Sequence, residues 1–393
     1  MVIGVGRSFA LRVVFFALLS ILFGWGMTTL SEGVIASKWT FEDSWVVKMF
    51  EVSEVPVEET EEGVLFDEWR TEALDIDVLF LSGEYRGTRA VARVEHLKDN
   101  KLDLRPGLHY ILSYNEFEDG SRIFFVSDIF RAPVFVGLFT GAVIFFCLVT
   151  GLTGIRALVG LFLSFVILVK LLLPGLLKGY PPQALGVAAV AGVALVTILS
   201  VVRRRRCWPS AFSGALGGCV SALVFGWGSI FMLHLSGLST GTASLLGSTI
   251  PGMDLRGILL TSIIIGASGA VLDVAVSVTS AMAEMKDHDP GIEARVLFQS
   301  GINVGKEVLG SMVNTLVFAY FGNSLVLSLL ILEAEPIPIA MLNDAVIAEE
   351  VIRALAGTAG LLLTIPLTAL FGALMMSGSV VSGNVLKDES SHG

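Results

Sequence analysis

The residues best suited to chemistry in this sequence lie in three long apolar segments, where ionisable side chains are rare. In GASGAVLDVAVSVTSAMAEM (266–285), the side chains of Asp273, Ser277, Ser280 and Glu284 are offset by 4, 7 and 11 residues. These offsets place them on one face of a helix. A carboxylate facing lipid at this depth costs about 2.5 kcal/mol or more. Asp273 is therefore either a polar tie between helices or part of a binding site.

The second segment, SGINVGKEVLGSMVNTLVFAY, repeats this arrangement. Asn303, Glu307, Ser311 and Asn314 are offset by 4, 8 and 11 residues and share a helical face. Lipid does not solvate such side chains, so polar faces of successive helices should face one another. Hydrogen bonds between helices are worth only about 0.6 kcal/mol each, and they require no ionisable group. Two carboxylates in this setting therefore favour a functional role.

The third segment, EEVIRALAGTAGLLLTIPLTAL (349–370), carries Glu349 and Arg353 at its start. Arg353 is expected near the membrane boundary, where it would form a structural pair with Glu350 or another outer acid. The predicted depths of the helices in the membrane place Asp273 and Ser277 at about the same level as Glu307, Ser311 and Asn314. Together with Ser280 and Glu284 on the same face, they are expected to form the transport path or ion-binding site: Asp273, Ser277, Ser280, Glu284, Glu307, Ser311 and Asn314.

The composition defines the environment of these segments. The 393 residues are 54% hydrophobic and 16% charged, with a mean hydropathy of +0.78. Soluble domains have about 25% charged residues, so an integral membrane protein is expected. Apolar runs of about 20 residues mark membrane-spanning helices. Eight spans are predicted, at about 11–30, 132–153, 157–177, 183–202, 212–234, 256–280, 307–331 and 351–376.

Basic loops predict the orientation of these spans. The run Arg203–Arg206 should remain cytoplasmic, which also places both termini inside and residues 31–131 outside. The expected location is the bacterial cytoplasmic membrane, crossed several times. The first span could instead be a cleaved signal, since Val34-Ile35-Ala36 offers a small-residue site. Its apolar run is long for a signal, which favours an uncleaved anchor over residues 1–30.

Residues 31–131 are expected to form an extracytoplasmic region. They contain 22 acidic and 11 basic residues. Residues 31–63 have the composition of a solvated acidic linker. From about residue 72, short alternating runs separated by turn residues predict four or five strands and a small β-barrel, possibly of the OB type. Phe80, Tyr110 and Phe125 are expected in its core. The acidic balance argues against a nucleic-acid partner.

The sequence lacks the usual signatures of enzymes and cofactors. It has no GxxxxGK[ST] loop and no HExxH. Asp273 with Glu307 could imitate an aspartyl protease dyad, but a protein that is not an enzyme and has no cofactor is favoured. Cys147, Cys207 and Cys219 show no metal-binding spacing. Whether the carboxylates bind a metal is left open.

The three polar segments, taken in order, resemble the YibE/F-like family of bacterial multi-span membrane proteins. The resemblance rests on Asp-Val-Ala at 273–275 with the polar residues after it, on segment 310–315 and on the Ile365-Pro366 step. The sequence departs from the family pattern at Lys306-Glu307, where we associate an Arg-Asp pair with the family. The resemblance implies the fold and a membrane location but no settled substrate.

The fold class expected is a polytopic α-helical membrane protein with a small extracytoplasmic β-barrel-like domain between its first two helices. Residues 132–235 would hold spans two to five, and residues 236–393 would hold spans six to eight and a cytoplasmic tail. The leading hypothesis is a secondary transporter or channel for a small solute or cation. The alternative is a membrane scaffold whose outer domain recruits a protein partner. Either could work as a homo-oligomer in the lipid bilayer.

Overall fold

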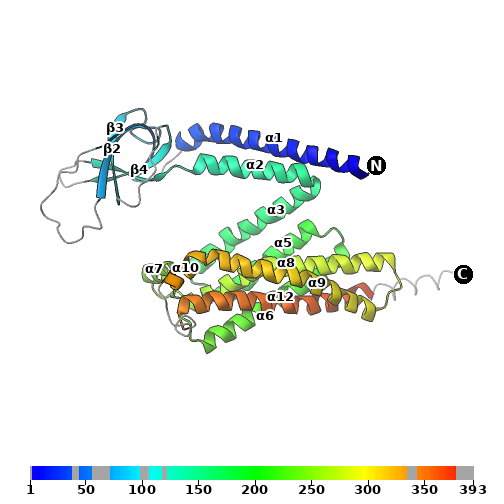
Figure 1. Ribbon diagram of the computed structural model, residues 1–393. Coiled ribbons are helices and arrows are strands. Elements are labelled where there is room, and N and C mark those ends of the chain that lie inside the picture. Colours follow the sequence, from blue (N-terminus) through cyan, green and yellow to red (C-terminus); the bar gives the residue numbers. More distant parts are fainter. Residues whose placement is uncertain are drawn as a thin grey trace, which may run out of the picture. The chain divides into compact units, whose positions relative to one another are not determined.

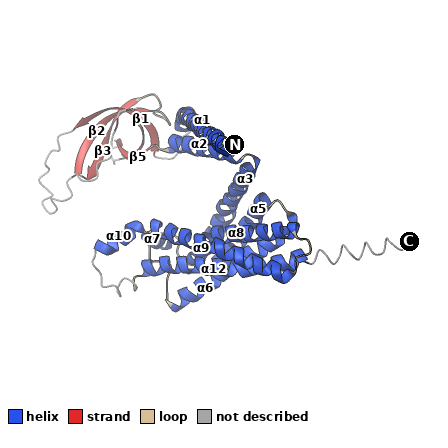
Figure 2. Cartoon of the chain, turned by 45° about the vertical axis from the view of Figure 1, so that its right-hand side comes forward, coloured by secondary structure: helices blue, strands red, loops and turns tan. Residues whose placement is uncertain are grey.

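A computed structural model describes residues 2–37, 44–54, 71–97, 105, 107–116, 122–333 and 343–377. The chain divides into two compact units, Met1–Gly154 and Ile155–Gly393. The first unit contains all the strands in the described part of the chain, and the second is built from helices (Figure 2). Each unit is described by itself below.

Two long helices of the first unit, α1 (Val2–Ser37) and α2 (Ala132–Thr150), lie side by side (Figure 1). Glycines allow their backbones to approach closely. A Cβ at Gly24 would lie 2.7 Å from the carbonyl oxygen of Gly137, and one at Gly141 would lie 2.9 Å from that of Ser20. Small residues at a helix crossing are typical of association within a membrane.

Five strands between these helices form a small barrel: β1 (Ser44–Glu54), β2 (Thr71–Phe80), β3 (Arg89–Leu97), β4 (His109–Glu116) and β5 (Arg122–Ile129). The strand order is β1-β2-β3-β5-β4, and β4 pairs with β1 to close the barrel. β3 and β5 are parallel, whereas the other neighbouring strands are antiparallel. The small β-barrel expected from the sequence is therefore present. The predicted core residues Phe80 and Tyr110 are buried, and Phe125 is half-buried.

The structure corrects the acidic linker expected at residues 31–63. α1 continues to Ser37, and β1 occupies Ser44–Glu54, where Val46, Val47 and Met49 are fully buried. β-branched side chains pack well in a sheet, and here they outweigh the acidic composition of the surrounding sequence. Residues 55–63 of the expected linker lie outside the described residues.

The second unit is built around α8 (Leu255–His288), which packs against α5 (Pro182–Val201), α6 (Trp208–Met232), α9 (Ala294–Asn323) and α12 (Ala345–Ser377). The Asp254 carboxylate caps α8 by accepting a 2.9 Å hydrogen bond from the Gly257 N–H. The remaining elements of the described chain are α3 (Leu152–Ile167), the π-turn η2 (Leu168–Leu172), α4 (Leu173–Leu177), the 3-10 turn η3 (Arg205–Cys207), α7 (Gly241–Thr249) and α10 (Leu325–Glu333).

Within the described residues, seven helical segments are long and apolar enough to cross a membrane, one fewer than predicted. The missing one is the span expected at 307–331. There α9 ends at Asn323 and α10 begins at Leu325, so the segment is not one continuous helix. Gly322, Asn323 and Ser324 interrupt it, and these residue types have low helix propensity. The polar face of α9 also lowers the hydropathy of this helix.

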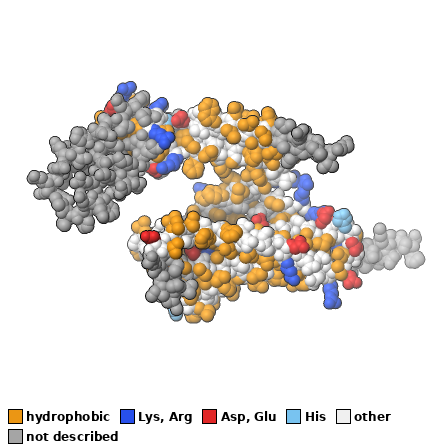
Figure 3. All heavy atoms as spheres, viewed as in Figure 1, with side chains coloured by type: hydrophobic (Ala, Val, Ile, Leu, Met, Phe, Trp, Pro, Cys, Tyr) orange, Lys and Arg blue, Asp and Glu red, His pale blue; other side chains and the backbone are white. Residues whose placement is uncertain are grey.

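Glycines set the crossing of α6 and α12 at the centre of the second unit. A Cβ at Gly218 would lie 3.0 Å from the Gly360 carbonyl oxygen and would collide with the Thr364 hydroxyl. That hydroxyl donates a 2.7 Å hydrogen bond to Gly360 within α12. The exposed surfaces of the helices are rich in apolar side chains, as the hydrophobic groups in Figure 3 show. Apolar exposure on this scale marks contact with lipid.

Candidate functional site

The predicted polar face of α8 is a narrow exposed strip on an otherwise packed helix. Asp273, Ser277, Ser280 and Glu284 are all exposed, whereas their neighbours in the sequence are largely buried. Gly266 and Gly269 continue the strip toward the start of the helix and are also exposed. Among the described residues, Asp273, Ser277 and Ser280 have no hydrogen-bond partner. The carboxylate of Asp273 is therefore exposed within the apolar span.

The polar face of α9 is exposed as well. Asn303, Glu307, Ser311 and Asn314 lie on the side of the helix opposite Gly301 and Gly305, which are buried against the neighbouring helices. The Ser311 hydroxyl donates to the Val308 carbonyl at 3.0 Å, a bond within its own helix. The distance between Gln299 Nε2 and Asn303 Oδ1, 3.5 Å, is at the outer limit for a hydrogen bond. Neither contact ties α9 to another helix.

Two contacts define the level at which α8 and α9 meet. A Cβ at Gly301 would lie 2.7 Å from Sδ of Met282, and one at Gly266 would lie 2.8 Å from the Tyr320 hydroxyl. Because the helices are antiparallel, Asp273 and Ser311 each lie about midway between these contacts. The two polar faces thus share a level, as the sequence predicts. Across the described residues, however, no hydrogen bond or ion pair joins one face to the other.

Glu284 differs from the rest of the α8 face because it has a partner. Its Oε2 lies 2.8 Å from Nη2 of Arg204, and the same guanidinium nitrogen lies 2.9 Å from Oδ2 of Asp287. His288 Nε2 is 3.6 Å from the other oxygen of Glu284. This ionic cluster joins the end of α8 to the connection between α5 and α6. Glu284 therefore has a structural contact that Asp273 lacks.

The predicted pair of Arg353 and Glu350 is present in α12. Arg353 Nη1 donates to Oε1 of Glu350 at 2.5 Å, and both side chains are about four-fifths buried. Nearby, Glu349 is only 6% exposed. Within the described chain, Oε1 of Glu349, Oε2 of Glu350, Nε of Arg353 and the Tyr320 hydroxyl are buried without a partner. Buried polar atoms in native proteins nearly always bind another group or water, so this cluster is suited to hold water.

Tyr320 is the residue of this cluster that sequence reasoning missed. A tyrosine near the end of an apolar helix resembles the aromatic residues of a membrane interface, so its type and position give no separate signal. Metal binding finds no support either: in the described part of the chain, no three His, Cys, Asp or Glu side chains gather as ligands. Cys207 and Cys219 are buried free thiols, and Cys147 is half-buried.

These features define an integral membrane protein whose apolar helices carry exposed polar faces. Residues 137–378 match the family described as YibE/F-like protein, and the chain belongs to that family. The family region includes α8, α9, α12 and the polar residues of all three. Comparison with curated proteins and with solved structures found no match.

Proposed function

We propose that the protein is a secondary transporter or channel for a small cation or solute, with the polar faces of α8 and α9 as its path. The observation that carries this proposal is the exposed, unpartnered carboxylate of Asp273 in the middle of an apolar helix. A tie between helices would be buried and hydrogen-bonded, as Ser210 of α6 and Thr279 of α8 are, with their hydroxyl oxygens 3.2 Å apart. Asp273, by contrast, is exposed and has no hydrogen-bond partner among the described residues.

The cost of a carboxylate in lipid implies that something polar covers this face. At the centre of a bilayer the cost is about 2.5–3.5 kcal/mol on insertion scales, so water, a cation or a protein surface must lie against Asp273. Gly269 on the same strip, where a Cβ would meet nothing within 4 Å, would allow another helix to approach closely. A second copy of this chain is the covering surface we propose, with a water-filled path between the copies.

The proposed setting is the cytoplasmic membrane of a bacterium, with the basic end of the second unit inside. Arg203, Arg204, Arg205 and Arg206 lie together at this end, beside the last turn of α8. A basic cluster of this kind favours the cytoplasmic side. The amino terminus would then be cytoplasmic and the barrel extracytoplasmic. The carboxyl terminus would be cytoplasmic as well if α9, which is antiparallel to α8, supplies an eighth crossing in addition to the seven apolar segments.

Cation flux in proteoliposomes tests the proposal. The purified chain would be reconstituted with a proton-sensitive dye inside the vesicles, and sodium or potassium gradients would be applied. Flux should appear with the unaltered chain and fall at least tenfold with Asp273→Asn. The matched control is Asp289→Asn, which alters an exposed carboxylate in the connection after α8 and should leave flux unchanged. Equal flux from the unaltered chain and Asp273→Asn would contradict the assigned role of this carboxylate.

The second candidate function, a scaffold, is supported by the surface of the barrel. Val91 of β3 is 58% exposed and Leu108, just before β4, is 41% exposed. Exposed apolar residues on a small domain outside the membrane would suit a protein partner. Crosslinking from position 108 would capture such a partner, and loss of that crosslink on Val91→Ser, without any change in cation flux, would separate the two functions.

A further inference from the structure

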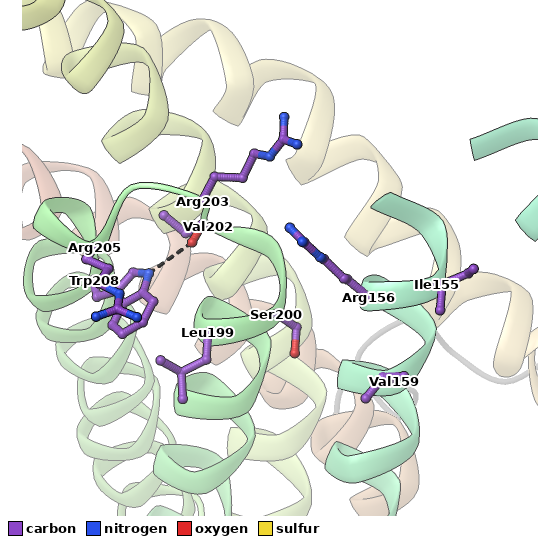
Figure 4. Close-up of a pocket in the computed structure, with 9 residues that line it drawn as sticks. All are labelled: Ile155, Arg156, Val159, Leu199, Ser200, Val202, Arg203, Arg205 and Trp208. Atoms are coloured by element: carbon purple, nitrogen blue, oxygen red, sulfur yellow. Dashed lines mark hydrogen bonds between the residues drawn. The ribbon is translucent and has the colours of Figure 1, made fainter. Parts of the chain in front are cut away.

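A cavity of about 440 Å³ opens in the second unit beside the first turns of α3 and the connection between α5 and α6. Three arginines contribute to its walls: Arg156 from α3, Arg203 from the connection, and Arg205 from η3. In Figure 4 the side chains of Arg156 and Arg203 extend into the same space from opposite sides, while Arg205 lies next to Trp208. Among the residues that the structure describes, no acidic side chain lines the cavity. It is therefore strongly positive.

Close packing holds the three arginines in place. α3 approaches α5 at Gly160, where a Cβ would lie 2.8 Å from the Ser200 hydroxyl oxygen. This contact is one helical turn from Arg156, so it sets the position of that side chain beside the end of α5. The indole N–H of Trp208 donates to the Val202 carbonyl at 2.9 Å and holds the chain just before Arg203. Arg205 stacks 5.8 Å from the centre of the same indole.

Among the described residues, no carboxylate neutralises the charges of these arginines. Arg204, in the same loop, is bound by Glu284 and Asp287, but it does not line the cavity. Within the described residues, Arg156, Arg203 and Arg205 form no ion pair with a carboxylate. Guanidinium groups bind phosphate through paired hydrogen bonds, and they lose less hydration than an ammonium group would. The cavity thus matches a phosphate group.

Apolar side chains also line the cavity, and they indicate whether the phosphate belongs to a lipid or to a soluble molecule. Ile155, Val159 and Leu199 line it and are 46%, 51% and 44% exposed, on helices that cross the membrane. Trp208 lies at the end of its helix, where aromatic residues mark the membrane interface. A soluble phosphate would leave these apolar side chains uncovered, whereas a lipid would place an acyl chain on them.

We propose that this cavity binds the headgroup phosphate of an anionic phospholipid, with Arg156 and Arg203 contacting the phosphate and an acyl chain lying along Val159 and Leu199. Basic pockets between transmembrane helices are known to hold acidic headgroups. The site is separate from the polar faces of α8 and α9 and does not depend on the transport proposal.

Native mass spectrometry of the purified full chain, titrated with phosphatidylglycerol, tests this site. The unaltered chain should retain phosphatidylglycerol and should bind phosphatidylcholine much more weakly. Each arginine near anionic lipid contributes about fivefold in affinity, so Arg156→Ala with Arg203→Ala should weaken binding about 25-fold. Arg156→Lys with Arg203→Lys keeps both charges and should restore most of the binding. Arg206→Ala is the matched control, because Arg206 lies in the same loop but outside the cavity.

Two results would overturn the proposal. If Arg206→Ala weakened binding as much as the double variant, the attraction would belong to the charged surface in general and not to the cavity. If glycerol phosphate displaced phosphatidylglycerol at equal concentration, the site would hold a soluble phosphate and not a lipid. Circular dichroism and elution as a single peak would show that the double variant is folded, so that weaker binding reports on the cavity.

Discussion

The guanidinium of Arg204 lies 2.8 Å from the carboxylate of Glu284, and this contact joins the connection between α5 and α6 to the last turns of α8. It divides the polar face of α8 into two parts. Glu284 is held in an ionic cluster at the end of the helix, whereas Asp273, three turns earlier, has no partner among the described residues. Two acids on one helical face thus have different surroundings.

Glu284→Gln should therefore have only a small effect. The pair is exposed, and exposed ion pairs contribute about 0–1 kcal/mol to stability. We expect a change in melting temperature of about 2 °C or less in detergent, with cation flux retained. A loss of flux as large as that expected for Asp273→Asn would place Glu284 in the path, against this account.

The crossing of α6 and α12 should be sensitive to any side chain at Gly218. Gly218→Val inserts a side chain against the Gly360 backbone and Thr364, where there is no space for it. Overpacking of this kind costs about 1–3 kcal/mol or more. Gly228→Val is the matched control on the same helix, because a Cβ there would meet nothing within 4 Å. Thermal unfolding in detergent should separate the two variants, and equal melting temperatures would refute the packing described for this crossing.

The contributions of Arg353 and Glu350 to the free energy of unfolding should depend on each other. Removing one partner of a largely buried pair leaves an uncompensated charge and costs about 3 kcal/mol. Arg353→Met should therefore destabilise the chain more than Arg353→Met combined with Glu350→Gln. A double-mutant cycle of unfolding measurements gives the coupling energy. Strict additivity of the two single changes would show that the pair contributes nothing to the fold.

The junction between the barrel and α1 should weaken in acid. His109 Nδ1 lies 2.8 Å from Glu32 Oε1, and burial lowers the pKa of His109, although the Glu32 carboxylate opposes this effect. In the unfolded chain the histidine has a pKa near 6.5. The unfolded state then binds the proton at a higher pH than the folded state does. The free energy of unfolding should consequently fall as pH drops below about 6.5, by at most about 1.4 kcal/mol per pH unit.

Unfolding of the full chain, followed as a function of pH, measures this effect. His109→Gln should flatten the dependence between pH 6.5 and 5. Glu32→Gln removes the carboxylate that raises the pKa of His109, so that pKa should decrease further in a nuclear magnetic resonance titration. An increase in the pKa of His109 in this variant would contradict the conclusion that the Glu32 carboxylate raises it.

Sequence patterns predict the parts of this protein that depend on local periodicity. The offsets from Asp273 to Glu284 identify one helical face, and the alternating runs after residue 72 identify β2 to β5. β1 was missed because acidic residues around Val46 and Val47 give its sequence the composition of a linker. Which residues lie next to a polar face depends on how different helices pack, as Gly301 of α9 does against Met282 of α8. Periodicity along one helix contains no information about this packing. The unpartnered Tyr320 hydroxyl was missed for the same reason.

The most direct test of the central claim is whether water reaches the α8 face at the level of Asp273. Cys147, Cys207 and Cys219 would be replaced by alanine, and Ser277→Cys would be treated with a membrane-impermeant thiol reagent in cells and in inverted vesicles. Ser268→Cys, buried on the same helix, and Leu363→Cys, exposed on the apolar surface of α12, are the controls without water. Thr242→Cys on exposed α7 is the positive control. The account predicts labelling at Ser277→Cys but not at the two dry controls. Labelling at Thr242→Cys with none at Ser277→Cys would contradict a water-filled path along Asp273.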